Sequence, residues 1–566
     1  MAHYPKGSAE SNRKTKNMLI EDAKVNHRSR TSFADELWDV AVIGTGMGGA
    51  TVGYELAKAG HRVIFLEKGH ADFTNADDSL FDNEDPSARV RNGNWPTKIT
   101  GVVGEARSQF FAPLGCGAGG TTLLYAAALE RFDPSDFAFS SGTDHTMAGW
   151  PISFDQLLPY YRKAEKMFKV CGTSDPLCPD EGADLLVPPR LTECDQHFFE
   201  SFRSSGLHPY RLHVAYGYES GCKECGGYIC PRKCKGDAKT ICLEPALKTG
   251  NAHIIDRCEV ERLEADASEI KEITGYRGGE KISIRARIVV LAAGAYFTPV
   301  LLLKSTNKFW PNGLANTSDM VGRNLMFHVS DFIAVWPRGK FSIQGPRKTL
   351  AFRDFTVHRG IKLGLVQSTG LTAGYGNIVY FLKTAFDRSR WSWFKPARPL
   401  LRIPAYIASL IFGRATIFAT IMEDKPYREN RIVLDPNEPS GMRFEYVVHA
   451  ELRERISLLR GLIKKSLARH RLLILSQDVS LNYGHPSGTC RFGADPYTSV
   501  LDANNKAHGL NNLYVVDASF MPTSGGASPS LTIAANALRV ATHINNTLSR
   551  ENHSDASNAG FSDART

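Results

Sequence analysis

The sequence predicts an α/β protein with an α+β part, divided into two domains. The chain has 566 residues, more than the roughly 250–300 that one hydrophobic core usually serves. Residues 39–69 alternate between strand-like, helix-like and strand-like patterns, and further buried-strand patterns occur at 288–299 and 513–517. Hydrophobic residues make up 42% of the chain and charged residues 22%, which is typical of a globular protein.

Charge and cysteine usage limit the partners and the compartment. The net charge of +9 comes from 68 basic and 59 acidic residues, without the long basic run that nucleic-acid binding favours. Residues 1–36 form a polar, basic-leaning segment without the apolar core of a secretory signal. We expect 1–36 and the polar segment 549–566 to be disordered tails. Eleven cysteines without such a signal favour free thiols or ligands and a cytoplasmic location.

A glycine-rich turn separates the first strand from the first helix. The apolar run 40–43 has the pattern of a buried parallel strand, and 50–59 has that of a helix. The glycines between them have the GxGxxG spacing of a Rossmann-type unit: Gly44, Gly46 and Gly49. In that unit they allow a tight turn, a close approach to a pyrophosphate and tight helix–strand packing, in that order. The N-terminus of the following helix would face the phosphates.

A second strand, at 62–66, ends at Glu67. This carboxylate follows the glycines by about 20 residues, where it can accept hydrogen bonds from a ribose diol. The complete order of strand, helix, strand and acid predicts dinucleotide binding. It leaves NAD and FAD as alternatives.

Three further segments favour FAD. Residues 113–123 read PLGCGAGGTTL, 485–493 read HPSGTCRFG, and 513–533 read as strand, acid, loop and helix start. Together with the first glycine motif, they resemble the glucose–methanol–choline (GMC) oxidoreductase family. The resemblance implies a Rossmann-type FAD-binding domain beside a substrate domain with a mainly antiparallel sheet. It places the FAD domain at 37–130, 235–330 and 480–548, and the substrate domain at 131–234 and 331–479.

The resemblance also carries cofactor contacts over to matching positions. Besides the residues of the first unit, these are Gly117, Gly119, Gly120, Thr121, Val260, Asp517 and Ala518. Val260 would contact the adenine through its backbone, after a strand at 253–258. Asp517 would lie beside the ribityl chain and pyrophosphate, with a simple turn cap as the alternative. The helix starting near Ser528 would point its N-terminus at the flavin pyrimidine, where negative charge collects on reduction.

The histidine of the HPSGT segment, His485, matches the active-site histidine of the family. Alcohol oxidation removes a proton from oxygen and a hydride from carbon, and the resemblance implies that flavin N5 accepts the hydride. The protein must then supply a base near the hydroxyl, and an imidazole suits that role. The sequence thus predicts an FAD-dependent enzyme that oxidises the CH–OH group of an alcohol, of the sugar, sterol or fatty alcohol class.

One position departs from the family pattern. Members usually carry His or Asn before the proline at 529, where this sequence has Ser528. Serine has a shorter reach, so either Asn482 or Asn536 compensates, or the chemistry depends on His485 alone. The departure leaves a flavin-dependent lyase or decarboxylase as an alternative. A subunit of a membrane-associated electron-transfer dehydrogenase complex is another, and the electron acceptor (oxygen, a quinone or a protein) stays open.

Four cysteines lie close together in the sequence: Cys222, Cys225, Cys230 and Cys234. Four thiolates within 13 residues can close around zinc or an iron–sulfur cluster. The spacing of the last three resembles that of family members that carry such a cluster. Packed thiols without a metal are the alternative.

Two segments of the substrate domain bear on partners and packing. Residues 391–412 combine aromatic and basic residues with a short apolar run at 403–412. This pattern is typical of a peripheral membrane contact or of an apolar entrance to the active site. The alternative is that 403–412 packs into the domain. The run 415–422 reads as a core strand, and we also expect a strand near 447 followed by a helical stretch to Arg469.

Overall fold

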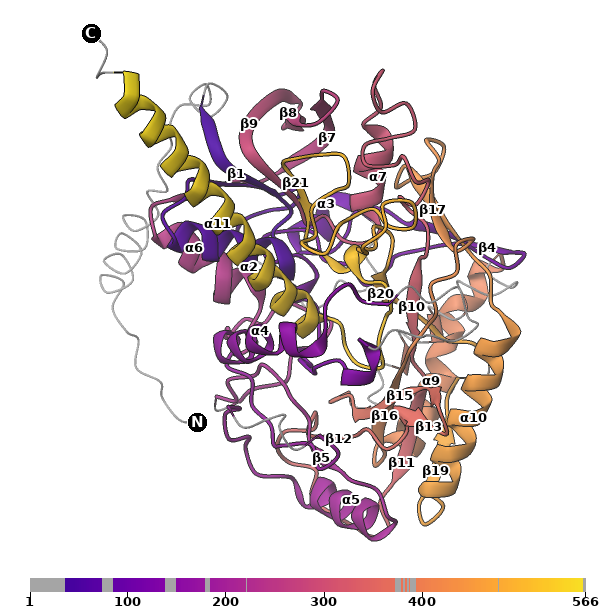
Figure 1. The fold of residues 1–566 in the computed structure, drawn as a ribbon. Helices are drawn as coiled ribbons and strands as arrows, with labels where there is room; N and C mark the ends of the chain where they lie inside the picture. The colour runs from indigo at the N-terminus through magenta and orange to yellow at the C-terminus, as the bar shows by residue number, and fades with distance from the viewer. Residues whose placement is uncertain are drawn as a thin grey trace, which may run out of the picture.

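The computed structural model describes residues 36–73, 85–137, 149–178, 184–219, 221–371, 378–379, 382–383, 386, 393–476 and 478–562. Two large sheets dominate the fold, as Figure 1 shows. Of the tail expected at 1–36, all but Glu36 lies outside the described residues, as do positions 391–392 of the aromatic segment.

The first large sheet has a parallel core in the order β6–β2–β1–β9, with β21 paired to the other side of β9. The bounds are β1 (Leu37–Ile43), β2 (Val63–Leu66), β6 (Ala252–Ile255), β9 (Glu280–Leu291) and β21 (Leu513–Val515). The short apolar sequence of β2, VIFL, is completely buried, as expected for a parallel strand covered on both faces. Strands β7 (Cys258–Ala265) and β8 (Ile270–Arg277) extend this sheet by antiparallel pairing onto β9.

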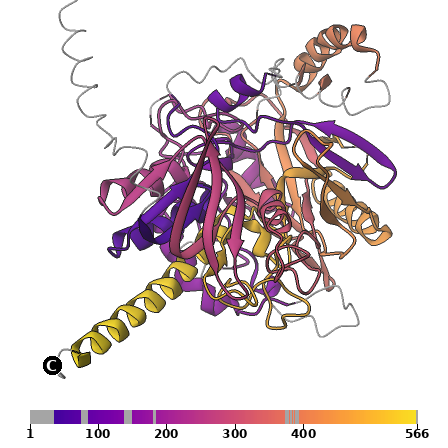
Figure 2. The ribbon, with the colours of Figure 1, turned by 90° about the horizontal axis from the view of Figure 1, so that it is seen from above.

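Four helices pack together beside this sheet. Helix α2 (Met47–Lys58) begins after Gly46 and contacts α6 (Glu244–Lys248) and the long α11 (Ser530–Ser562). Helix α4 (Phe154–Met167), which starts at a capping box of Ser153 and Gln156, also contacts α11. The C-terminal end of α11 projects from the body (Figures 1 and 2). The backbone of residues 549–562, where we expected a disordered tail, is helical and belongs to α11.

The second large sheet is antiparallel in every pairing, with the order β19–β11–β16–β15–β12–β5 and with β10 joining β16 to β20. Its strands are β5 (Tyr210–Arg211), β10 (Met326–Val329), β11 (Phe332–Trp336), β12 (Leu350–Phe352), β15 (Gly364–Ser368), β16 (Thr416–Met422), β19 (Arg471–Ile474) and β20 (Leu481–Ser487). Helices α5 (Glu193–Ser204) and α10 (Ala450–Ser466) contribute apolar side chains to the same core. The predicted combination of a parallel nucleotide-type sheet and an antiparallel sheet is confirmed.

Smaller elements connect these parts. Strands β17 (Arg431–Leu434), β18 (Met442–Tyr446), β3 (Ile99–Val103) and β4 (Ala106–Phe110) form a four-stranded sheet, and β13 (Val357–His358) and β14 (Ile361–Lys362) form a hairpin. The short helices are α3 (Pro86–Arg91), α7 (Phe297–Lys304), α9 (Arg402–Phe412), η2 (Gly120–Leu123), η3 (Pro134–Asp136), η4 (Lys239–Leu243), η5 (Lys395–Leu401) and η6 (Ala518–Phe520). Strand β18 pairs with β3, which joins segments assigned above to different domains. Strands β10 and β20 lie in the second sheet although both fall within the predicted FAD-domain ranges, and those ranges stay a prediction.

Two local expectations differ from the structure, and one is confirmed. The strand expected near 447 is wrong, because β18 ends at Tyr446 and His449 already serves as the extended N-cap of α10. The packing of 403–412 into the domain is also wrong, since Ala405 is the one buried residue of α9. The predicted core strand at 415–422 is confirmed as β16, which is buried from its second residue onward.

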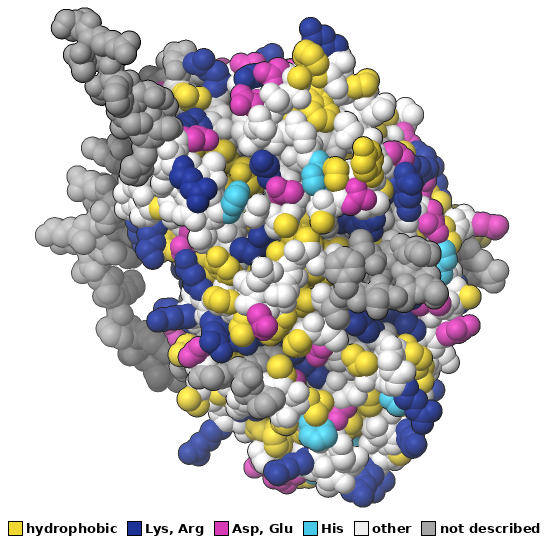
Figure 3. Space-filling view, viewed as in Figure 1, with side chains coloured by type: hydrophobic (Ala, Val, Ile, Leu, Met, Phe, Trp, Pro, Cys, Tyr) yellow, Lys and Arg dark blue, Asp and Glu magenta, His cyan; other side chains and the backbone are white. Residues whose placement is uncertain are grey.

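The surface and the helices carry two further findings. On the face shown in Figure 3, basic and acidic side chains are interspersed rather than gathered in one large patch. Within the described residues, no helix has both the length and the apolar character needed to cross a membrane.

Candidate active site

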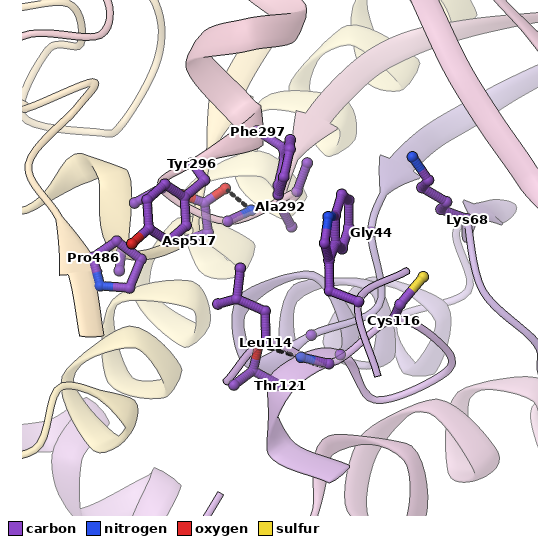
Figure 4. A pocket seen from close by; sticks show the side chains of 18 of the residues that line it. Gly44, Lys68, Leu114, Cys116, Thr121, Ala292, Tyr296, Phe297, Pro486 and Asp517 are labelled. Carbon is purple, nitrogen blue, oxygen red and sulfur yellow. Dashed lines mark hydrogen bonds between the residues drawn. The ribbon is translucent and has the colours of Figure 1, made fainter. Parts of the chain in front are cut away.

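A cavity of about 760 Å³ lies where the C-terminal ends of β1 and β9 meet the loops of three distant segments, and its volume falls in the range of ~300–1,000 Å³ typical of small-molecule and cofactor sites. Figure 4 shows residues from both ends of the chain around it, including Gly44, Thr121, Pro486 and Asp517. Of the predicted site residues, the lining includes Gly44, Gly46, Glu67, Gly120, Thr121, Val260, His485, Asp517 and Ala518. Gly49, Gly117, Gly119 and Ser528 are not among the lining residues.

The first glycine turn is closed by backbone packing. Gly44 has φ +95°, and a Cβ atom there would lie 2.4 Å from the carbonyl oxygen of Ala292. On the second glycine-rich loop, a Cβ atom on Gly120 would lie 2.8 Å from Cα of Gly46. The two glycine-rich loops therefore pack against each other with bare backbone, and the backbone of both lines the cavity.

Glu67 lines the cavity beside the first glycine turn and is hydrogen-bonded to the backbone around it. One carboxylate oxygen accepts hydrogen bonds from the backbone N–H of Thr45 (3.1 Å) and from its hydroxyl (2.6 Å). The other oxygen accepts from the backbone N–H of Gly69 at 2.9 Å. A carboxylate has about four acceptor positions, so Glu67 keeps capacity for a donor that enters the cavity, such as a ribose hydroxyl.

Two helix N-termini meet at the cavity. The first residues of α2, Met47 and Gly48, line it, and so do Ser530 and Ile533 in the first turn of α11. Unpaired N–H groups and the positive dipole end at each start favour negative charge in the cavity. This donor set, together with the bare glycine backbone and Glu67, fits the pyrophosphate and a ribose of FAD.

Two contacts refine the predicted cofactor residues. Asp517 accepts hydrogen bonds from the backbone N–H groups of Ser519 (2.9 Å) and Gly294 (3.0 Å), and burial raises the pKa of its carboxyl. It is therefore a turn cap and a cavity-lining residue at once. Val260 follows the predicted strand, which is β6, and itself lies inside the next strand, β7, where it is paired with Gly275.

His485 contacts a second histidine that the sequence did not single out. Its Nδ1 lies 3.1 Å from Nδ1 of His328 on β10, and Nε2 of His328 lies 3.0 Å from the Ser524 carbonyl oxygen and 3.1 Å from that of Gly525. Burial lowers the pKa of His328 to about 4. Burial, together with the neighbouring His328 and Lys348, lowers the pKa of His485 to about 3. Both rings are therefore neutral at pH 7.

Hydrogen-bond chemistry fixes the tautomer of each ring. Carbonyl oxygens only accept, so Nε2 of His328 carries its hydrogen and Nδ1 is a bare acceptor. The facing Nδ1 of His485 must then carry a hydrogen and donate it. This leaves Nε2 of His485 as the basic nitrogen of a ring that lines the cavity.

Lys348 is a second residue that sequence reasoning missed. It is buried, its ammonium group donates to the carbonyl oxygen of the cavity residue Ala126, and burial lowers its pKa to about 7. An isolated lysine just before a short strand carries no local signal of such a position.

Ser528, the residue before Pro529, was expected at the active site but does not line the cavity. It is 6% exposed, and the next two residues, Pro529 and Ser530, do line the cavity. Of the two residues considered as substitutes, Asn482 lines the cavity. The other, Asn536, is buried and accepts a hydrogen bond from Arg539 at 3.0 Å.

The four clustered cysteines come together in space. Cys225, Cys230 and Cys234 are buried in one cluster, with the half-buried Cys222 packed against it. Buried Lys235 connects this cysteine segment to the second glycine-rich loop, which lines the cavity. Its ammonium group donates hydrogen bonds to the carbonyl oxygens of Leu123 in that loop and of Cys225, each at 2.7 Å.

The four thiols of this cluster are free, and three of them interact with one another. Burial raises the pKa of Cys225 and Cys234, and both side chains hydrogen-bond with Cys230. The described part of the chain contains no group of three or more His, Cys, Asp or Glu side chains arranged to hold a metal ion. The structure therefore does not support the iron–sulfur cluster.

Comparison with known proteins shows the family of the chain. Residues 42–330 match the N-terminal profile of GMC oxidoreductases, and 426–537 match the C-terminal one. The chain is 27% identical to 6'''-hydroxyparomomycin C oxidase of Streptomyces lividus over 90% of this chain and 92% of that protein. It is 27% identical to 2-methyl-1,2-propanediol dehydrogenase of Mycolicibacterium austroafricanum over 91% and 96%. The fold resembles pyridoxine 4-oxidase from Mesorbium loti, with a TM-score of 0.60, 18% identity and coverage of 89% of this chain and 99% of that one. The chain belongs to the GMC oxidoreductase family of FAD-binding enzymes and acts as an oxidoreductase on CH–OH groups.

Proposed function

We propose that His485 is the base that takes the proton from a substrate hydroxyl while the neighbouring carbon is oxidised to a carbonyl. When bound, FAD supplies the acceptor for the hydride. The observation that carries this proposal is the contact between Nδ1 of His485 and Nδ1 of His328. It leaves Nε2 of a cavity-lining imidazole free of hydrogen, and a positioned base must be within hydrogen-bond reach of the proton that it removes.

His328 acts as a positioning residue in this proposal. It touches the base rather than the substrate, and its two carbonyl partners hold its own ring in one tautomer. After proton transfer, His485 would be an imidazolium ion with its Nδ1–H still bonded to His328. Such a partner limits rotation of the base and fixes which nitrogen receives the proton.

We infer a hydroxyl-rich small molecule, of the sugar or polyol class, as the substrate. The two relatives described above are named for 6'''-hydroxyparomomycin C and for 2-methyl-1,2-propanediol.

Anaerobic titration of the holoenzyme with a panel of alcohols tests the proposal. Sugars, small diols, sterols and fatty alcohols should be compared by the loss of oxidised flavin absorbance. Bleaching by a sugar or diol, with the matching aldehyde or ketone as product, is the expected result. Reoxidation by air, a soluble quinone or a protein acceptor then identifies the electron acceptor. Absence of bleaching by every alcohol in a flavin-loaded preparation would refute the proposed reaction.

A further inference from the structure

Helix α9 presents its large apolar side chains to solvent. Ile403, Ile407 and Leu410 are 63%, 53% and 68% exposed, and this spacing places them on one face of a helix. Ala405, on the opposite face, is buried. A surface helix normally turns its apolar face to the core, so α9 has the reverse arrangement.

The helix is held at its C-terminal end. The indole N–H of Trp336 on β11 donates to the carbonyl oxygen of Ile411 at 3.1 Å, and its ring lies 5.4 Å from that of Phe412. Figure 2 shows α9 standing off the rest of the molecule. The contacts of Trp336 therefore fix the C-terminal end of α9, while the apolar face of the helix stays exposed.

The charge of the segment has one sign. Residues 393–422 contain four basic residues, Lys395, Arg398, Arg402 and Arg414, and no acidic residue. Arg402 and Arg414 are exposed beside the two ends of α9. Exposed Trp393 and Phe394 precede the helix. Aromatic and basic residues around an apolar face are typical of a helix that binds the surface of an anionic membrane.

We propose that α9 and the preceding residues 393–401 bind the surface of a bilayer that contains anionic lipids. The 11 residues of α9 span about 16 Å, too short for the ~30 Å hydrocarbon core. The helix therefore lies parallel to the surface, with Ile403, Ile407 and Leu410 at the acyl boundary. Symmetric pairing with a second copy of this face would bring four like charges on each side together, which opposes self-association.

Co-sedimentation of the full-length holoenzyme with lipid vesicles tests this proposal. Binding to phosphatidylcholine vesicles should increase when phosphatidylglycerol is added and decrease at high salt. The variant Ile403→Ser/Ile407→Ser/Leu410→Ser should bind anionic vesicles at least roughly tenfold more weakly, because it removes the buried apolar contact. Arg402→Gln/Arg414→Gln should weaken binding by about fivefold per charge.

Matched controls separate the site from general surface properties. Leu186→Ser/Val187→Ser removes exposed apolar side chains elsewhere, and Arg190→Gln/Lys340→Gln removes two exposed charges elsewhere. Both should bind vesicles like the wild type, and every variant should keep its flavin content. Equal binding of the α9 variants and the wild type would overturn the proposal. So would concentration-dependent dimers of the wild type that the triple serine variant abolishes.

Discussion

The Nδ1 atoms of His328 and His485 lie 3.1 Å apart although the residues are 157 positions apart in sequence. The antiparallel pairing of β10 with β20 brings the two rings together: it aligns Met326 with Ser487 and His328 with Asn482, and His485 lies in the irregular stretch of β20 between these two pairs. The second sheet thus positions the proposed base at a cavity whose nucleotide-type half belongs to the first sheet. Activity should depend on both residues, but in different ways.

Replacement of the base should stop catalysis without emptying the cofactor site. We expect His485→Ala to lower the rate of flavin reduction by roughly 10²–10⁴-fold, because general-base catalysis contributes about that much. Flavin content should stay at the wild-type level, since the glycine loops and Glu67 are untouched. Anaerobic stopped-flow reduction measures the rate, and His358→Ala on the hairpin β13–β14 is the control. Reduction of the variant at the wild-type rate would remove His485 from the mechanism.

Replacement of the positioning residue should reduce kcat more than it changes KM. His328→Phe removes the acceptor for Nδ1–H of His485, and we expect kcat to fall about tenfold, equivalent to one hydrogen bond of roughly 1.4 kcal/mol. His328→Gln offers one amide oxygen as acceptor and one N–H group as donor, so it should recover part of the loss. Equal losses in the two variants, with unchanged pH profiles, would indicate a purely structural role for His328.

The sequence allowed prediction of those parts of the site that lie within one local motif. The strand, glycine turn and helix at 37–58 follow from hydrophobic periodicity and backbone sterics, and Glu67 follows from the next strand. His485 was identified by its motif. These signals are contained in short stretches of chain, where local rules apply.

Features that depend on distant pairing could not be predicted. His328 lies in an apolar stretch, and only the register of β10 against β20 brings it to His485. The strand expected near 447 covered the sequence VVHAEL, but within it His449 is the N-cap and Ala450 the first residue of α10. The apolar sequence of 403–412 is compatible with a buried helix and with an exposed one, and only the packing of α9 in the structure distinguishes the two.

The activity should not fall between pH 7 and 6, where an exposed histidine acting as a base would become protonated. A base must be unprotonated, and burial lowers the pKa of His485 to about 3 and that of His328 to about 4. Since protonation occurs only below these values, kcat/KM should stay nearly constant as the pH falls from 8 to 5. Pre-incubation at each pH and return to pH 7 controls for unfolding. A loss of reversible activity centred near pH 6.5 would show that the base titrates like an exposed histidine.

A comparison of two glycines separates backbone strain from crowding in the cofactor turn. Gly44 and Gly60 have nearly the same φ, +95° and +97°, but a Cβ atom on Gly60 would meet nothing within 4 Å, whereas one on Gly44 would lie 2.4 Å from the Ala292 carbonyl oxygen. We expect Gly60→Ala to lower the free energy of unfolding by about 1–3 kcal/mol through strain alone and to keep its FAD. Gly44→Ala should lose roughly 1–3 kcal/mol more, because β1 and β9 must move apart, and should purify with little flavin. Urea unfolding and flavin absorbance measure the two effects. If both variants lost the same stability and kept full flavin content, the close approach at Gly44 would not be what shapes the cofactor cradle.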